Sequence, residues 1–342
     1  INFFMPSPEH RQPKTETQDF PPDLSSESLS SPENDFALEL AETLRLKEQY
    51  LAQVKVLYQS GILENFPATK EHPTPELGIV GIDGKEYPLP SYEDILDRLS
   101  NPETKELIEK KISQGFVKLQ LTPFALPLSV LIQRYKDVLL KTNRESGIKA
   151  TNGETLELNE DDPLDVWDKF IQADNPQTPE DKQLEYHIQT YDRHQTKEDR
   201  GGKYKSELLQ DPQNAWTISL IEDLPDLPAE SEGQIISNRK QIEVDKSPQD
   251  YLKLLQTQKE YQGETGQTPE EALTTYLTYL QQQQTAIDDR EGQGKANFLV
   301  GNYLSGYAPR FCWVRGDCRP YLYGDGYDGR NSSIGCRPAV RF

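Results

Sequence analysis

The chain has 342 residues, of which 57 are acidic and 37 are basic, and its formal net charge is −20. This excess of negative charge disfavours nucleic acid or an anionic membrane as the main partner, because both repel an acidic surface. No stretch approaches the roughly 20 apolar residues that a membrane helix requires, and no signal-peptide pattern is present. The sequence therefore predicts a cytoplasmic protein without membrane insertion, and it leaves display at the cell surface open.

The first 77 residues divide into two segments. Residues 1–31 are rich in Pro, Ser, Glu and Gln, which predicts a disordered tail. Residues 32–77 are expected to form an N-terminal helix, from Pro32 to about Ser60, and a linker, because apolar residues recur at helical spacing and Gly61 follows. Two interpretations of this helix stay open: a coiled coil that joins chains into a homo-oligomer, or a helix docked on its own domain.

Residues 78–114 are expected to form a hairpin around Asp83-Gly84 and then a charged helix from Tyr92 to Ser113. Residues 115–342 are expected to form one α+β domain in which strands and helices are interleaved. Its expected strands are 116–124, 215–222 and four near 297–303, 311–315, 319–323 and 335–342, and its expected helices are 128–143, 248–259 and 269–287. The segment from Asn159 to Ile171, which holds Trp167, is expected to be short and helical or irregular.

The last 46 residues have a different composition from the rest of the chain. Glu, Lys and Gln make up 81 of residues 1–296, yet residues 297–342 contain none of them and no Met or His. The same 46 residues carry six Arg, five Tyr, seven Gly and all three cysteines. Rigid aromatic side chains mixed with small polar ones are typical of antibody binding loops. Low β-propensity explains a shortage of Glu and Lys, but not the joint loss of Gln and Met.

A genetic rule accounts for this set of residues better. An AAC or AAT codon whose adenines mutate freely can encode Asn, Tyr, Asp, His, Ser, Gly, Cys, Arg, Phe, Leu, Ile, Val, Thr, Ala or Pro, but never Glu, Lys, Gln, Met or Trp. Residues 297–342 use almost only the permitted set, and the exception, Trp313, is interpreted as a fixed scaffold residue.

Residues 297–342 resemble the variable region of target proteins of diversity-generating retroelements, in which a reverse transcriptase rewrites adenines at the 3′ end of one gene. The ending Gly335-Cys336-Arg337-Pro338-Ala339 is similar to the Gly-x-Arg-Pro-Ala close of their C-type-lectin domains, of the formylglycine-generating-enzyme-like subtype. The preceding layout, including Leu220 to Pro228 and Ile287-Asp288-Asp289, resembles variable proteins of uncultivated small-genome bacteria.

The resemblance implies a C-type-lectin fold, with a twisted antiparallel sheet and two main helices, that displays a hypervariable ligand-binding face from residues 297–342. The implied scaffold consists of Pro309, Trp313, Arg315, Arg319, Leu322, Gly335, Arg337, Ala339 and Val340. The implied displayed set consists of Tyr307, Phe311, Cys312, Asp317, Cys318, Tyr321, Tyr323, Asp325, Tyr327, Asp328, Asn331, Ser332 and Ser333. Gly324, Gly326 and Gly329 are expected to let this region turn.

The tripeptide Arg315-Gly316-Asp317, which integrin-type receptors read, lies between Cys312 and Cys318. A two-residue turn at its Gly-Asp pair would place Cys312 opposite Tyr321, so that the two cysteines do not face each other. We therefore interpret the tripeptide as incidental and expect no disulfide between these cysteines.

The favoured interpretation is a binding protein, not an enzyme, that needs no metal or cofactor and binds a protein or another macromolecular ligand. Two alternatives stay open. One is an oxidase of the formylglycine-generating type, whose copper-binding cysteine pair could come only from Cys312, Cys318 and Cys336. The other is a structural or assembly protein that uses the helix at 32–60.

Overall fold

The computed structural model of the protein describes residues 32–68, 75–292 and 294–342, so the disordered tail predicted at 1–31 lies outside the described residues. The described chain is a mixed α+β structure built largely on antiparallel strand pairs, as predicted. Its α-helices are α1 (Pro32–Thr43), α2 (Leu46–Gln59), α3 (Tyr92–Leu99), α4 (Pro102–Ser113), α5 (Leu128–Ser146), α6 (Lys205–Leu208), α7 (Pro248–Thr257) and α8 (Pro269–Gln283).

Two sheets organise the molecule. The first has the antiparallel order β12-β19-β9-β4, so the last strand of the chain lies between two earlier ones. The second has the order β18-β14-β16-β17-β7 and contains the antiparallel hairpin β16–β17. Their strands are β4 (Phe116–Thr122), β7 (Asp165–Val166), β9 (Thr217–Glu222), β12 (Thr265–Gly266), β14 (Ala296–Phe298), β16 (Ala308–Val314), β17 (Arg319–Asp325), β18 (Ile334–Gly335) and β19 (Pro338–Arg341).

Smaller sheets complete the structure. β1, β2 and β3 form a three-stranded antiparallel sheet, β13 pairs in parallel with β5 next to β6, and two further pairs are β10–β11 and β15–β8. Their bounds are β1 (Glu64–Phe66), β2 (Glu76–Val80), β3 (Glu86–Pro88), β5 (Ile148–Ala150), β6 (Thr155–Leu156), β8 (Glu185–Tyr186), β10 (Ile235–Ile236), β11 (Arg239–Lys240), β13 (Thr285–Ala286) and β15 (Asn302–Tyr303). The β2–β3 turn at Asp83-Gly84 confirms the predicted hairpin.

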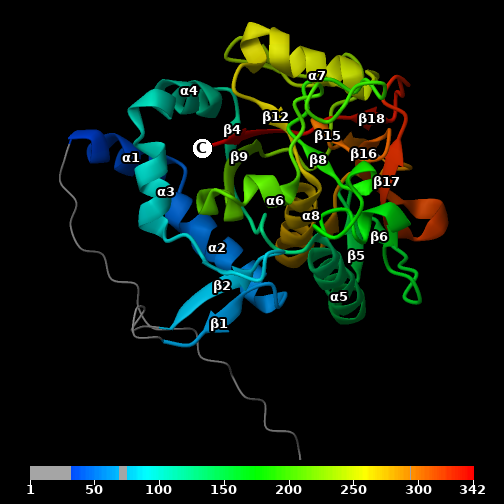
Figure 1. Ribbon diagram of the computed structural model, residues 1–342, viewed down its shortest axis with the longest axis horizontal. Helices are drawn as coiled ribbons and strands as arrows, with labels where there is room; N and C mark the ends of the chain where they lie inside the picture. Colours follow the sequence, from blue (N-terminus) through cyan, green and yellow to red (C-terminus); the bar gives the residue numbers. More distant parts are fainter. Residues whose placement is uncertain (1–31, 69–74, 293) are drawn as a thin grey trace, which may run out of the picture.

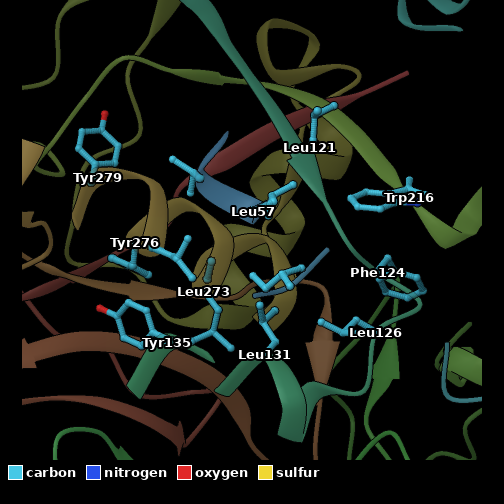
Figure 2. Close-up of a cluster of buried hydrophobic side chains, with 14 of the residues drawn as sticks. Leu57, Leu121, Phe124, Leu126, Leu131, Tyr135, Trp216, Leu273, Tyr276 and Tyr279 are labelled. Carbon is cyan, nitrogen blue, oxygen red and sulfur yellow. The ribbon is translucent and has the colours of Figure 1, made fainter. Parts of the chain in front are cut away.

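The two long helices α5 and α8 pack against each other, with α8 near the middle of the molecule and α5 at its lower edge in the view of Figure 1. Figure 2 shows Leu131 and Tyr135 of α5 beside Leu273 and Tyr276 of α8, in one cluster of buried apolar side chains. Figure 1 shows α1, α3 and α4 on one side of the molecule and the hairpin β16–β17 on the opposite side. The core therefore separates the N-terminal helices from the C-terminal hairpin.

The prediction of a single helix from Pro32 to Ser60 is wrong. The chain forms two helices that meet at Arg45, whose backbone has a left-handed conformation (φ 52°). No Gly or Pro marks this break. Its cause is tertiary: α1 packs against α3, whereas α2 packs against β4 and α8. Leu57 of α2 is 1% exposed and belongs to the main core, which favours docking on the chain's own domain over a coiled coil.

The helix predicted from Tyr92 to Ser113 is also two helices, α3 and α4. The Asn101 side chain accepts a hydrogen bond from the Glu103 amide and caps α4, and Pro102 occupies its first position. A proline there cannot donate to the preceding turn, so it begins a helix instead of continuing one. The predictions of β4, α5, β9 and α7 are confirmed to within a few residues, and α8 ends earlier than predicted, at Gln283.

In the parts of the chain that the structure describes, no helix combines the length and the apolar character that crossing a membrane requires.

Candidate ligand-binding face

The hairpin β16–β17 has a register in which Cys312 lies opposite Tyr321 and Phe311 lies opposite Leu322. Because neighbouring residues of a strand point to opposite faces, one side of this hairpin turns toward α5 and α8 and the other turns away from them. The outward side chains, together with Asp317 of the turn, are called the hairpin face below. They are Arg310 and Val314 of β16 and Arg319, Tyr321, Tyr323 and Asp325 of β17. Cys312 lies on the same side but is buried under a second cluster, against which Val314 and Tyr321 also pack.

The turn of the hairpin comprises Arg315 to Cys318, and the Cys318 amide donates to the Arg315 carbonyl at 3.1 Å. The predicted pairing of Cys312 with Tyr321 is confirmed. Arg315 donates to Asp289 and to Glu154, each at 2.7 Å, and the hydrogen bond from Arg315 lowers the pKa of Glu154. The guanidinium of the Arg-Gly-Asp tripeptide is therefore held by the protein's own carboxylates, in agreement with a scaffold role for Arg315.

Two tyrosines form the aromatic part of the hairpin face. The rings of Tyr321 and Tyr323 are 5.4 Å apart and tilted by 57°. The Tyr321 hydroxyl donates to an Asp317 carboxylate oxygen at 2.5 Å, and partial burial together with this bond raises the pKa of Tyr321 to about 12. Both rings are half-buried and keep a surface open to a partner, and the phenol of Tyr321 stays protonated at neutral pH.

Arginines of the hairpin face are paired with nearby carboxylates. Arg319 forms ion pairs with Asp162 and, at 3.0 Å, with Asp165. The Arg310 Nε lies 3.0 Å from an Asp325 carboxylate oxygen. Because these pairs are exposed or half-buried, each contributes little stability, but together they fix where charge is presented.

Residues from outside the C-terminal segment also lie against the hairpin β16–β17, and the sequence analysis did not assign them a role. β7 pairs in parallel with β17 and brings Asp165 and Trp167 to its edge. The rings of Trp167 and Tyr307 meet edge to face at 5.1 Å, and the Lys169 ammonium lies 4.3 Å from the Trp167 ring centre. The only signal in the sequence was a tryptophan in a polar, irregular segment.

Gly324 has a different role from the turn that was predicted for it, because it lies inside β17. A Cβ atom at this position would come within 2.4 Å of the Trp167 ring and 3.0 Å of Tyr307. The absence of a side chain at Gly324 thus allows the aromatic pair to pack against the strand.

Two members of the predicted displayed set are not displayed, and their assignment is corrected. Phe311 is 1% exposed because it faces inward, where its ring stacks on Tyr276 with the ring centres 4.0 Å apart. Cys312 is 0% exposed because a second buried cluster, which includes Ile334, Cys336 and residues of α7, covers its side of the strand.

The remaining members of the set reach the surface to different degrees. Tyr307, Asp317, Asp328 and Ser332 are exposed, and Cys318, Tyr321, Tyr323, Asp325, Tyr327, Asn331 and Ser333 are half-buried. Tyr327 lies apart from the hairpin face, since its ring stacks on Tyr191 at 6.0 Å. Asn331 accepts a hydrogen bond from the Ser333 amide at 2.8 Å and so shapes a turn. The structure therefore brings together only part of the predicted set.

The residues assigned to the scaffold lie mostly in the core, as such a role requires. Pro309, Trp313, Leu322, Gly335, Ala339 and Val340 are buried. Arg315 and Arg319 are half-buried, and Arg319 lies on the hairpin face and not in the core that was predicted for it.

Arg337 connects three motifs that the sequence analysis identified: the Gly-x-Arg-Pro-Ala close, Ile287-Asp288-Asp289 and Leu220 to Pro228. It donates to both carboxylate oxygens of Asp288, at 2.9 and 2.6 Å, and to the backbone carbonyls of Leu224 and Pro225. Burial disfavours the charged guanidinium, but the Asp288 carboxylate outweighs this effect and raises the pKa of Arg337.

The three cysteines are free thiols in two environments. Burial raises the pKa of Cys312 to about 11, and it raises the pKa of Cys336 as well. Cys318 is half-buried in the hairpin turn, where its sulfur lies 3.7 Å from a Glu157 carboxylate oxygen. Burial and this carboxylate raise the pKa of Cys318 too, so all three cysteines are thiols at neutral pH. Among the described residues, no group of three or more His, Cys, Asp or Glu is suited to hold a metal ion.

Comparisons with known proteins identified no matching protein family, no similar curated protein and no similar solved structure.

Proposed function

We propose that this protein is a ligand-binding protein whose C-terminal face is one member of a diversified repertoire, produced by a diversity-generating retroelement on a C-type-lectin scaffold. The observation that most supports this proposal is the change in composition at residue 297, together with the place of residues 297–342 on the hairpin face. Residues 297–342 supply every side chain of the hairpin face, whereas α5 and α8, which lie behind it, belong to the ordinary part of the chain.

The two main helices and the antiparallel sheet support the proposed scaffold. α5 and α8 pack together, and β19 pairs with β9 and β12 in the middle of a four-stranded antiparallel sheet. Arg337 of the Gly-x-Arg-Pro-Ala close is held by Asp288, so the closing motif is tied to the core next to the hairpin. Such an arrangement lets outward side chains change while the core stays constant.

The chemistry of the hairpin face suits a macromolecular partner. Tyr321 and Tyr323 offer large, rigid contact areas with two hydroxyl groups, and ordering such side chains costs little entropy. Three hollows in the described structure, of about 230, 320 and 340 Å³, are lined by residues of other elements. None of these three hollows is lined by a residue of the hairpin face, which favours a protein or another large surface as the ligand, because small molecules bind in concave sites.

The test is to sequence the 3′ end of this gene, with its flanking DNA, from many cells of the source population. We expect substitutions confined to codons of surface positions such as 307, 317, 321, 325 and 331. We also expect a nearby near-copy that carries adenines at those codons, and a gene for a reverse transcriptase. An invariant segment with no near-copy would refute the proposal.

A further inference from the structure

Strand β4 forms one edge of the four-stranded sheet, because it pairs with β9 on one side only. The amides and carbonyls that point away from β9 belong to alternate residues along the strand. An unpaired edge of this kind readily accepts a strand from another chain. In this protein, the element that lies along the β4 edge is helix α2 and not a further strand.

Two glutamines of α2, one helical turn apart, bond to the edge in the way that a strand would. The Gln49 side chain accepts a hydrogen bond from the Leu119 amide at 2.8 Å and donates to the Val117 carbonyl at 2.9 Å. The Gln53 side chain accepts from the Leu121 amide at 2.7 Å and donates to the Leu119 carbonyl.

The match follows from the chemistry and the spacing of the two elements. A side-chain amide carries one carbonyl acceptor and N–H donors, as a backbone peptide unit does. Residues four apart on a helix lie on the same face, about 6 Å apart along the axis, and alternate residues of a strand are separated by nearly the same distance. Gln49 and Gln53 can therefore satisfy successive peptide groups of β4.

We propose that α2 closes the β4 edge in place of a fifth strand, and that this is the function of the N-terminal extension formed by residues 32–63. The partner that it excludes is the β4 edge of a second copy of this chain. The extension is then an element that prevents association, in contrast to the coiled-coil interpretation. This inference does not depend on the proposed binding function.

The surroundings of the two glutamines fit such a cover. Tyr50, Val56 and Leu57 of α2 are buried in the main core, so these apolar contacts and the glutamine hydrogen bonds together hold the helix on the β4 edge, and losing the bonds lets α2 leave the edge more often. A hollow of about 230 Å³ lies beside the contact between α2 and β4 and is lined by Gln49, Gln53 and Leu119, among others. The hollow gives water a path to the edge amides once the glutamines no longer bind them.

The test uses the full chain with Gln49→Met and Gln53→Met, singly and together, since methionine has a similar length and no amide. Gln59→Met is the matched control, because Gln59 is exposed on the same helix. Residue-resolved hydrogen exchange measures the β4 amides, and sedimentation velocity over a range of concentrations measures association.

We expect Gln49→Met to speed exchange of the Leu119 amide about tenfold and Gln53→Met to do the same for the Leu121 amide, with Gln120, which points to β9, unchanged. The double variant should form dimers at lower concentrations than the wild type and the control. Unchanged exchange in the single variants would overturn the assignment of the glutamines. Unchanged association of the double variant, with both edge amides accelerated, would overturn the edge-closing function.

Discussion

Replacing Phe311 by alanine tests which side of the hairpin is the core. The Phe311 ring is 1% exposed, stacks on Tyr276 at 4.0 Å and meets Tyr135 edge to face at 5.8 Å. Removing a phenylalanine that is fully buried costs about 3–5 kcal/mol, because transfer energy is lost and a cavity remains. The two aromatic contacts place the expected loss in the upper part of that range, since each adds about 0.5–1.5 kcal/mol to burial.

The assay is urea unfolding of Phe311→Ala, followed by far-ultraviolet circular dichroism. Tyr323→Ala is the comparison, because Tyr323 is half-buried on the hairpin face and its removal should cost about 1 kcal/mol or less. A loss below 1 kcal/mol for Phe311→Ala, or equal losses for the two variants, would refute the assignment of Phe311 to the core and return it to the displayed set.

Three further predictions concern the scaffold and the thiols. Arg337→Met should lower the free energy of unfolding by about 3–5 kcal/mol, because the buried Asp288 loses its counter-charge; a loss below 1 kcal/mol in urea unfolding contradicts this. Gly324→Ala should cost about 1–3 kcal/mol and change tryptophan fluorescence, whereas Gly329→Ala, with no atom within 4 Å of its added Cβ, should do neither. The native protein should react with Ellman's reagent at Cys318 alone, and the rate should increase as the pH rises toward the raised pKa of Cys318. The unfolded protein should react at all three cysteines, and three reactive thiols in the native protein would contradict the burial of Cys312 and Cys336.

Local signals in the sequence predicted most elements of the fold. The Asp83-Gly84 turn acts within a few residues, and the hairpin that it predicts is present, as are the strand predicted at 116–124 and the helix predicted at 269–287. The break at Arg45 could not be predicted in this way. It arises because α1 and α2 pack on different elements, and no pattern within the helix itself records that difference.

The candidate site was predicted less completely, for a related reason. The composition of residues 297–342 and the register of the hairpin follow from the sequence, but the burial of each face depends on what covers it. Phe311 is buried by Tyr276, which is 35 positions earlier in the chain, and Cys312 is buried by a cluster that includes residues of α7. Trp167 reaches the hairpin through a short parallel pairing that only the folded chain reveals.

The geometry of the hairpin also constrains the genetic mechanism proposed for it. Because inward and outward residues alternate along β16 and β17, a process that altered every codon would destroy the core as it varied the face. Rewriting limited to adenines avoids this only if the template codons for inward residues lack adenine.

This requirement yields a sharp prediction at Phe311, because phenylalanine can come either from an unaltered TTT or TTC codon or from a rewritten AAT or AAC codon. If Phe311 belongs to the core, as its stacking on Tyr276 indicates, the template copy must read TTT or TTC at this position and AAC or AAT at Tyr321 and Tyr323. A template with AAC or AAT at 311 would mean that a core position is diversified. The constant scaffold in the proposed function would then be wrong, even if the gene is variable.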